Sequence, residues 1–304
     1  MKKFLVISIA VLVLILGGFM FYVNNMLNKI KPKERVNIQK PNQNINTKTI
    51  NVILFGIDAR DLNAPSRSDT IIIVSINPQN KKVKLISLMR DMYIKIPGKG
   101  ENRINAAYAF GGPELALKTI NENFDLNITD YATVNFYGFE KIIDQVGGVE
   151  INVKEDEIKY INSYMKETAK LFGGEYREVK TAGLQTLNGR QALGYSRIRY
   201  VGHGDYERTE RQRRVLTEVF NKVKNQSIPK KIGLINNMLP YIETNLSRSQ
   251  IINLVTMFSN LDEYQIEQLR IPIDNSYKSQ KIHGMAVLVP DIEKNKNAIH
   301  EFLK

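Results

Sequence analysis

The sequence contains 304 residues, with 43 Lys and Arg against 31 Asp and Glu, which gives a formal net charge of +12. It has no cysteine and three histidines, which excludes a disulfide framework and a thiol nucleophile and argues against a zinc site. The excess of base leaves nucleic acid, a membrane surface and a phosphorylated substrate as candidate partners.

The first predicted element is a membrane span at residues 4–23, which contain no charged residue and one polar residue, Ser8. At about 1.5 Å of rise per residue, a helix of this length crosses the ~30 Å hydrocarbon core of a bilayer. The alternative is a cleaved signal peptide, but the run is longer than a usual apolar signal core and ends on bulky aromatic residues. We therefore predict an uncleaved signal-anchor that follows a cytoplasmic stub of residues 1–3.

A tether follows the predicted anchor. Residues 24–50 are rich in Asn and Lys, contain Pro32 and Pro41, and show no apolar period, so we predict an extracytoplasmic linker. The folded part is predicted at residues 51–304. Because this kind of composition does not return later in the chain, we expect a single domain there.

From residue 51 onward, short apolar runs alternate irregularly with amphipathic stretches. The runs suit strands buried in a sheet, and the stretches carry apolar residues at helical spacing. The pattern predicts an α/β fold, a three-layer domain with a mixed central sheet covered by helices. The predicted strands are Asn51–Ile57, Thr70–Ile76, Lys82–Leu88, Tyr131–Phe136 and Val149–Val153, and the predicted helices are Gly112–Phe124, Phe139–Val146, Asn188–Ser196, Glu210–Val223, Ser249–Ser259 and Ile292–Leu303.

Arginine is the residue type that suggests a chemistry. The chain has no glycine-rich phosphate loop and no GxSxG motif. Arginines instead gather near predicted strand ends and turns, and seven fall within residues 190–214. Their planar forks match two phosphate oxygens at once, so several that converge suit a diphosphate. The candidates are Arg60, Arg67, Arg90, Arg103, Arg197, Arg199, Arg208 and Arg211, with Gln212 expected on the same helix face as Arg208 and Arg211.

Carboxylates are interleaved with these arginines. Asp58 ends the first predicted strand and Asp69 precedes the second, so the two face one point if the strands are neighbours. Two carboxylates beside a diphosphate form a usual oxygen site for Mg²⁺, which also takes phosphate oxygens and water. The sequence thus predicts an Mg²⁺ (or Mn²⁺) site at Asp58 and Asp69, with Asp91 directly after Arg90 and Asp205 between two groups of arginines.

An ordered set of segments resembles the LytR-CpsA-Psr family. These segments run from about residue 51 to 223 and read NVILFGIDAR, SRSDTIIIVSINP, KLISLMRDMY, NRINAAYAFGG, FEKIIDQVGGVEINV, LNGRQALGYSRIRY and GDYERTERQRRVL. The resemblance implies an extracytoplasmic phosphotransferase that moves a glycopolymer, such as wall teichoic acid or capsule, from a polyprenyl diphosphate carrier to peptidoglycan. It also implies membrane lipid as a partner and makes nucleic acid the least supported one.

The resemblance also implies roles for particular residues. Asp58 and Asp69 match acids associated with Mg²⁺, and Arg60, Asp91, Arg103 and Arg211 fall in the same motifs. The positions that match contacts to the carrier diphosphate are Arg67, Arg90, Arg197, Arg199, Arg208 and Gln212. One departure is the YVGHG stretch between Arg199 and Asp205, where family members often carry an early acid.

The expected reaction is attack of a muramyl hydroxyl on the glycan-side phosphorus. Arg90 and the metal stabilise charge on the phosphoryl oxygens, and Asp69 or Asp91 takes the hydroxyl proton. Three other functions stay open from the sequence: a polyprenyl diphosphate hydrolase, a membrane-bound regulator without catalysis, and a glycopolymer-binding protein.

Overall fold

The computed structural model describes residues 49–59, 65–247, 250–251, 253–254 and 263–304. The predicted anchor at 4–23, nearly all of the linker and Arg60 lie outside these residues. Within the described part, no helix is both long and apolar enough to cross a membrane. Of the predicted helix Ser249–Ser259, only four residues are described, and they are helical.

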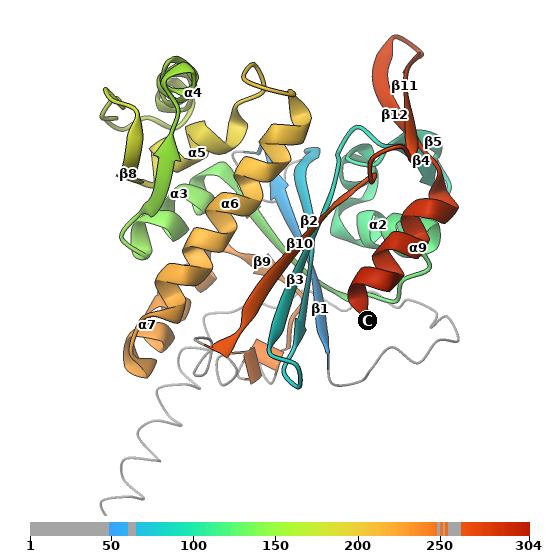
Figure 1. Ribbon diagram of the computed structural model, residues 1–304, viewed down its shortest axis with the longest axis horizontal. Coiled ribbons are helices and arrows are strands. Elements are labelled where there is room, and N and C mark those ends of the chain that lie inside the picture. Colours follow the sequence, from blue (N-terminus) through green and yellow to red (C-terminus); the bar gives the residue numbers. More distant parts are fainter. Residues whose placement is uncertain (1–48, 60–64, 248–249, 252, 255–262) are drawn as a thin grey trace, which may run out of the picture.

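A six-stranded mixed sheet forms the centre of the fold (Figure 1), in the order β10-β3-β2-β1-β6-β9. β1 pairs antiparallel with β2 and parallel with β6, while β3 pairs antiparallel with β2 and parallel with β10. Its strands are β1 (Ile50–Ile57), β2 (Ser68–Asn77), β3 (Lys82–Leu88), β6 (Asp130–Asn135), β9 (Glu243–Thr244) and β10 (Gln265–Ile271).

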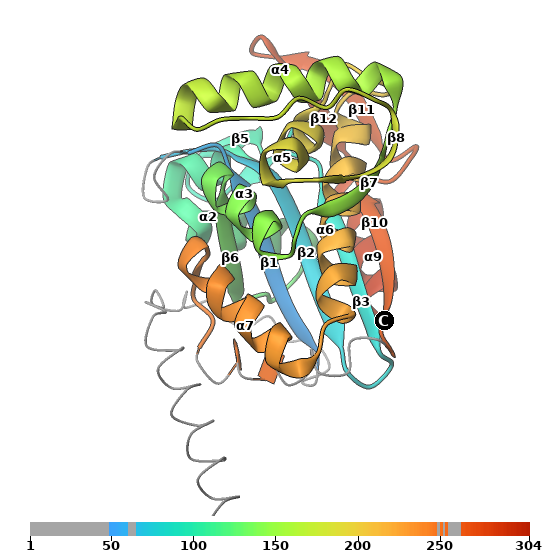
Figure 2. The ribbon, with the colours of Figure 1, turned by 90° about the vertical axis from the view of Figure 1, so that its left-hand side faces the viewer.

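Helices cover both faces of this sheet, as the sequence predicts. α2 and α9 cover one face, and Figure 2 shows α3, α6 and α7 in front of the other, with α4 across the upper end. The helices are α2 (Ala106–Phe124), α3 (Phe136–Gln145), α4 (Glu155–Phe172), α5 (Gly189–Arg197), α6 (Asp205–Lys224), α7 (Ile228–Met238) and α9 (Ile292–Leu303), with a 3₁₀ turn at Leu239–Tyr241.

Three two-stranded ribbons complete the described elements. β4 (Tyr93–Ile96) pairs with β5 (Gly100–Arg103), β7 (Val149–Val153) with β8 (Gly183–Leu187), and β11 (Tyr277–Ile282) with β12 (Met285–Pro290). The predicted strand Val149–Val153 therefore exists but pairs outside the central sheet. The other ribbon strands and α4, α7, β9 and β10 are not among the elements that the sequence pattern predicts.

Side chains of the central strands alternate between two apolar cores. Ile71 and Ile73 of β2 are buried in the core beneath α2 and α9, whereas Ile72 is buried in the core on the α6 side. Successive residues of a strand point to opposite faces, so an unbroken apolar run is what a sheet covered on both sides requires.

Two glycines let α5 pack closely between its neighbours. A Cβ on Gly189 would lie 2.1 Å from the carbonyl oxygen of Glu140 in α3, and one on Gly194 would lie 2.8 Å from that of Ile161 in α4. Both distances are far below a van der Waals contact, so a larger residue would push α5 outward. This packing holds the C-terminal end of α5, which carries Arg197, near the sheet.

Candidate active site

An apolar cavity lies between the sheet and helices α3, α5 and α6, with a volume of about 330 Å³. Its floor comes from β1, β2 and β6, and its walls come from aromatic and aliphatic side chains of the helices. The apolar lining is Leu54, Phe55, Ile72, Ala132, Val134, Phe136, Phe139, Ile142, Ile143, Leu193, Val215, Leu216 and Val219. Such a lining suits a hydrocarbon chain.

Charged side chains gather at one end of this cavity. β1 and β2 are antiparallel neighbours, and the last residue of β1, Ile57, lies opposite the first residue of β2, Ser68. Asp58 and Asp69 come directly after these two residues in the chain, so both lie near the same edge of the sheet. Both acids line the cavity, together with the polar or charged residues Tyr164, Ser196, Arg197, Arg199, Arg208 and Gln212. The predicted neighbourhood of Asp58 and Asp69 is thus present.

Ion pairs connect the members of this charged end. Asp69 lies 2.7 Å from Arg90 Nη1 and 3.6 Å from Arg199 Nη2. Asp205 lies 2.8 Å from Arg208 Nε, 3.4 Å from Arg90 Nη2 and 3.9 Å from Arg199 Nε. Two carboxylates therefore hold three guanidinium groups within reach of one another, as binding of a multiply charged anion requires.

The electrostatics of this cluster follow from burial and crowding. Burial lowers the pKa of Arg208, and the like charge of Arg90 lowers it further, whereas Asp205 raises it. Although burial works against it, the pKa of Asp69 falls, because Arg90 and Arg208 stabilise its charge. Burial raises the pKa of Asp58, and the charge of Asp69 adds to this, while Arg197 opposes it.

Arg197 is positioned by α4 and α3. Its guanidinium lies 4.7 Å from the ring centre of Phe136 and 4.6 Å from that of Tyr164. It also donates to Glu167 at 2.9 Å and to Thr168 at 3.3 Å. Stacking between two rings fixes the plane of a guanidinium, so Arg197 lines the cavity in one orientation.

The structure does not bring every predicted residue to the cavity. Arg67 is exposed on the approach to β2. Arg90 does not line the cavity but pairs with Asp69, which does, and with Asp205. Asp91 and Arg103 pair with each other at 3.1 Å, and Asp91 lies 3.7 Å from Arg90, so both support Arg90 from outside.

Arg211 corrects the prediction that it shares a face with Arg208 and Gln212. Its side chain is 2 % exposed and turns toward α4, where Nε donates to Glu157 at 2.8 Å. Its Nη2 donates to Glu207, one turn earlier in α6, at 2.9 Å. Positions three apart on a helix are separated by about 60°, enough for a buried acid on a neighbouring helix to take one of them. Arg211 is therefore a structural residue.

Some site residues come from elements that the sequence pattern does not predict. Tyr164, Glu167 and Thr168 come from α4. The sequence pattern gives Asp205 no role, because the helix predicted there begins at Glu210, five residues after the observed start of α6. The sequence signal for Asp205 is its position two residues before the ERTER stretch, where helical spacing puts it one turn from Arg208.

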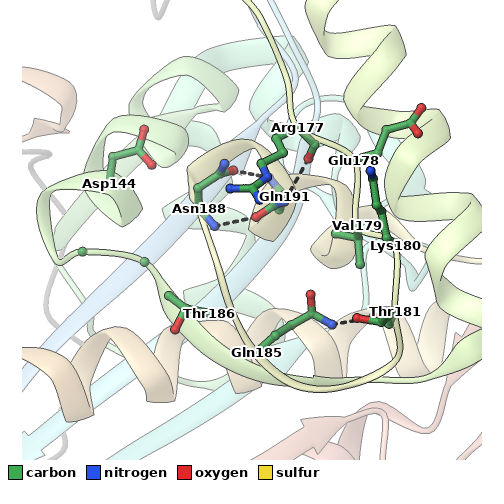
Figure 3. A pocket seen from close by; sticks show the side chains of 12 residues that line it. Asp144, Arg177, Glu178, Val179, Lys180, Thr181, Gln185, Thr186, Asn188 and Gln191 are labelled. Carbon is green, nitrogen blue, oxygen red and sulfur yellow. Dashed lines mark hydrogen bonds between the residues drawn. The ribbon is translucent and has the colours of Figure 1, made fainter.

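A second hollow, of about 460 Å³, lies beside the end of α3 and the start of α5 (Figure 3), and we call it the outer hollow. Its lining is polar and comes from the end of α3, the 177–181 segment, β8 and the start of α5. The Gln191 side chain there donates to the Arg177 carbonyl at 2.9 Å and forms a capping box with Asn188. None of the predicted site residues lines this hollow, so the apolar cavity is the candidate active site.

An α/β domain with an apolar cavity that ends in arginines and carboxylates has the shape and charge that suit an amphipathic, phosphorylated ligand. The chain belongs to the LytR_cpsA_psr family, whose model matches residues 19–301. This confirms the family predicted from the sequence and, with the structural matches below, its mixed α/β fold.

Several named proteins are similar to this chain. "Regulatory protein MsrR" of Staphylococcus aureus (strain COL) is 36% identical over 262 residues, covering 84% of this chain and 74% of the relative. "Polyisoprenyl-teichoic acid--peptidoglycan teichoic acid transferase TagU" of Oceanobacillus iheyensis is 33% identical over 279 residues, covering 84% and 82%.

Solved structures agree with this assignment. A structure of "TagT bound to LI-WTA" matches with a TM-score of 0.69 and 27% identity, covering 89% of this chain and 97% of that one. Another, "LytR-CPS2A-psr family protein YwtF (TagT) with bound octaprenyl pyrophosphate lipid", matches with a TM-score of 0.65 and 25% identity, covering 89% and 97%.

Proposed function

We propose that this protein transfers an anionic glycopolymer from a polyprenyl diphosphate carrier to peptidoglycan and so forms a phosphodiester. The observation that carries the proposal is the apolar cavity whose charged end is lined by Asp58, Asp69, Arg197, Arg199 and Arg208. The relatives support it, because TagU is named a teichoic acid transferase and TagT holds a prenyl pyrophosphate.

In this proposal the prenyl chain lies in the cavity and its diphosphate meets the arginines at the end. A hydroxyl of the peptidoglycan glycan attacks the phosphorus that carries the glycopolymer, and a new P–O bond forms. The bond from that phosphorus to the bridging oxygen breaks, and polyprenyl monophosphate leaves. Arg197, Arg199 and Arg208 stabilise the charge that develops on the phosphoryl and leaving oxygens.

The proton of the attacking hydroxyl goes to a carboxylate at the charged end of the cavity. Asp69 lines the cavity and is ionised at neutral pH, since its pKa is lowered by Arg90 and Arg208 in spite of burial. Asp91 does not line the cavity, so we assign it to holding Arg90 and Arg103. Asp69 is therefore the proposed proton acceptor of the two.

Asp58 and Asp69 would hold Mg²⁺, or Mn²⁺. Two carboxylates on one cavity wall, with room for phosphate oxygens and water, fit the ligands that Mg²⁺ takes in phosphate sites. Asp58 supports this fit, because its pKa is raised by burial and by the charge of Asp69. When bound, the ion would neutralise charge on the phosphoryl oxygens.

We also propose that residues 4–23 anchor the protein in the cell membrane, with the domain of residues 51–304 on the outer side. A carrier embedded in the bilayer then reaches the cavity without leaving the membrane surface.

The test of the function is a transfer assay with the purified full chain, a synthetic polyprenyl diphosphate bearing a short glycopolymer, and peptidoglycan oligomers. We expect acceptor molecules to gain the polymer and polyprenyl monophosphate to accumulate in equal amount. Release of monophosphate at the same rate without acceptor would indicate a hydrolase instead. Binding of the donor without turnover would indicate a regulator or a glycopolymer-binding protein.

Asp58→Asn tests the metal proposal. We expect the Mg²⁺ concentration for half-maximal transfer to rise at least about tenfold, the lower range for weakening a metal site. Without metal, the variant should unfold at no lower temperature than wild type at neutral pH. A carboxyl whose pKa is raised by folding stabilises the folded protein at low pH, and this stabilisation is lost as the pH rises through its pKa, so the amide removes nothing that stabilises the fold at neutral pH. Asp91→Asn, outside the cavity, is the matched control, and an equal Mg²⁺ effect there would contradict the assignment.

A further inference from the structure

A third hollow, of about 440 Å³, lies between α6 and the end of β10, and we call it the α6–β10 hollow. It is lined by His203, Tyr206, Arg213, Gln268, Arg270 and Asp274, among others. Figure 1 shows α6 beside β10 in this part of the fold. Arg213 follows Arg208 by five positions, which places it about 140° around the helix from the active site.

Arg213 is a buried cation without a carboxylate. Its residue is 8 % exposed, and its Nε donates to the side-chain oxygen of Gln268 at 3.0 Å. Among the described residues no acid lies within ion-pair distance of it, and its Nη1 is buried without a hydrogen-bond partner. A guanidinium stays protonated in proteins, so Arg213 keeps a buried charge without an ion-pair partner in the described structure, and its Nη1 keeps an unsatisfied donor.

The other three arginines of α6 are paired. Arg208 contacts Asp205 at 2.8 Å, Arg211 contacts Glu157 at 2.8 Å, and Arg214 contacts Glu210 at 2.7 Å. Glu207 and Glu210 also line the α6–β10 hollow, but their ion pairs are with Arg211 and Arg214. Arg213 is the exception on this helix within the described structure.

A second guanidinium borders the same hollow. Arg270 lies 4.5 Å from the ring centre of Tyr206, pairs with the highly exposed Asp274, and has its Nε buried without a partner. Burial lowers the pKa of Arg213, and the charges of Arg270 and Arg214 lower it further, whereas Glu210 opposes them. Two like charges held near each other at a hollow are stabilised by an anion between them.

We propose that the α6–β10 hollow binds a phosphodiester group of the glycopolymer, held by Arg213 and Arg270. The ligand class rests on the proposed function, in which the donor carries an anionic polymer. The tetrahedral oxygens of a phosphodiester match guanidinium forks. The hollow and the active site share the first turns of α6, where Arg208 lines the cavity and Tyr206 lines the hollow, so a polymer that leaves the cavity along the start of α6 reaches it. A second contact on the same polymer raises the affinity for long donors.

The first measurement is calorimetric binding of a soluble glycerol phosphate oligomer to the purified full chain. We expect Arg270→Gln and Arg213→Gln each to weaken binding at least tenfold, and an uncharged polyol of equal length not to bind. Arg177→Gln is the matched control, since it removes one positive charge at the outer hollow of Figure 3. Because Arg213 is buried, its variant is checked by thermal unfolding, and the partly exposed Arg270 gives the independent result.

The second measurement compares two donors in the transfer assay. Arg270→Gln should raise KM at least tenfold for a donor with a long phosphodiester polymer and leave KM unchanged for a donor that carries only its first sugars. Equal binding by wild type and both variants, or equal KM effects on both donors, would overturn the α6–β10 site. If the oligomer binds through these arginines but wild type transfers nothing, the site stands and the proposed function fails.

Discussion

Replacing Arg208 with Ala should lower kcat/KM for glycopolymer transfer by about 10²–10³-fold, the usual loss when one preorganised charge-stabilising donor is removed. Arg208 lines the cavity, its side chain is 3 % exposed, and its pKa is lowered by burial and by Arg90. Asp69 and Asp205 are shared among three guanidinium groups, so a diphosphate would balance the positive charge that is left over in this cluster. The measurement is steady-state transfer with the synthetic donor.

The fold should survive this substitution. Asp205 would keep Arg90 at 3.4 Å and Arg199 at 3.9 Å, so it would not become a buried, unpaired acid. Arg208→Lys, which keeps the charge but not the fork, should fall between the alanine variant and wild type. Arg177→Ala, at the outer hollow, should transfer like wild type. Wild-type rates in the Arg208→Ala variant would contradict the placement of the diphosphate.

The sequence predicts the part of this site that depends on strand neighbours. Asp58 and Asp69 flank two apolar runs, and the runs pair because both must be buried in one sheet. Each acid then falls at the same edge, as the register opposite Ser68 confirms. The prediction needs only strand adjacency, which is strongly favoured for successive strands.

The directions of the α6 arginines could not be predicted from the sequence. Helical spacing groups Arg208, Arg211 and Gln212 on one side, but it does not show which residues of neighbouring elements contact them. Glu157 decides the direction of Arg211, and it comes from α4, fifty-four residues earlier in the chain. The sequence also lacks a signal for the start of α6, because the N-cap residue before Asp205 is a glycine, which has no side chain to cap the helix. Local signals therefore define which residues are charged, and tertiary contacts decide which of them face the ligand.

Among the substitutions proposed for this protein, Arg211→Ala should lower the free energy of unfolding the most. Arg211 and Glu157 are 2 % and 1 % exposed, and removing the cation would leave a buried carboxylate without its partner. Breaking a buried ion pair in this way costs about 3–5 kcal/mol of the free energy of unfolding. For a domain of this size that corresponds to a fall in Tm of roughly 6–20 °C, measured by calorimetry.

Arg211 also supports the segment that carries Arg199. Its Nη1 donates to the carbonyl of Ile198 at 3.3 Å, and its Nη2 to that of Val201 at 3.5 Å. We therefore expect the surviving Arg211→Ala protein, assayed well below its Tm, to bind the donor diphosphate more weakly than wild type. Arg190 offers the matched control, because its pair with Glu140 is also largely buried but makes no contact with residues 198–201.

Arg190→Ala should thus lower Tm without changing donor affinity. The double variant Arg211→Met with Glu157→Leu removes both charges, and it should recover most of the stability lost by Arg211→Ala, since the penalty comes from the orphaned carboxylate. It should not recover donor affinity, because the contacts to the carbonyls of Ile198 and Val201 stay lost. Recovery of both properties together would mean that Arg211 acts on the site through stability alone.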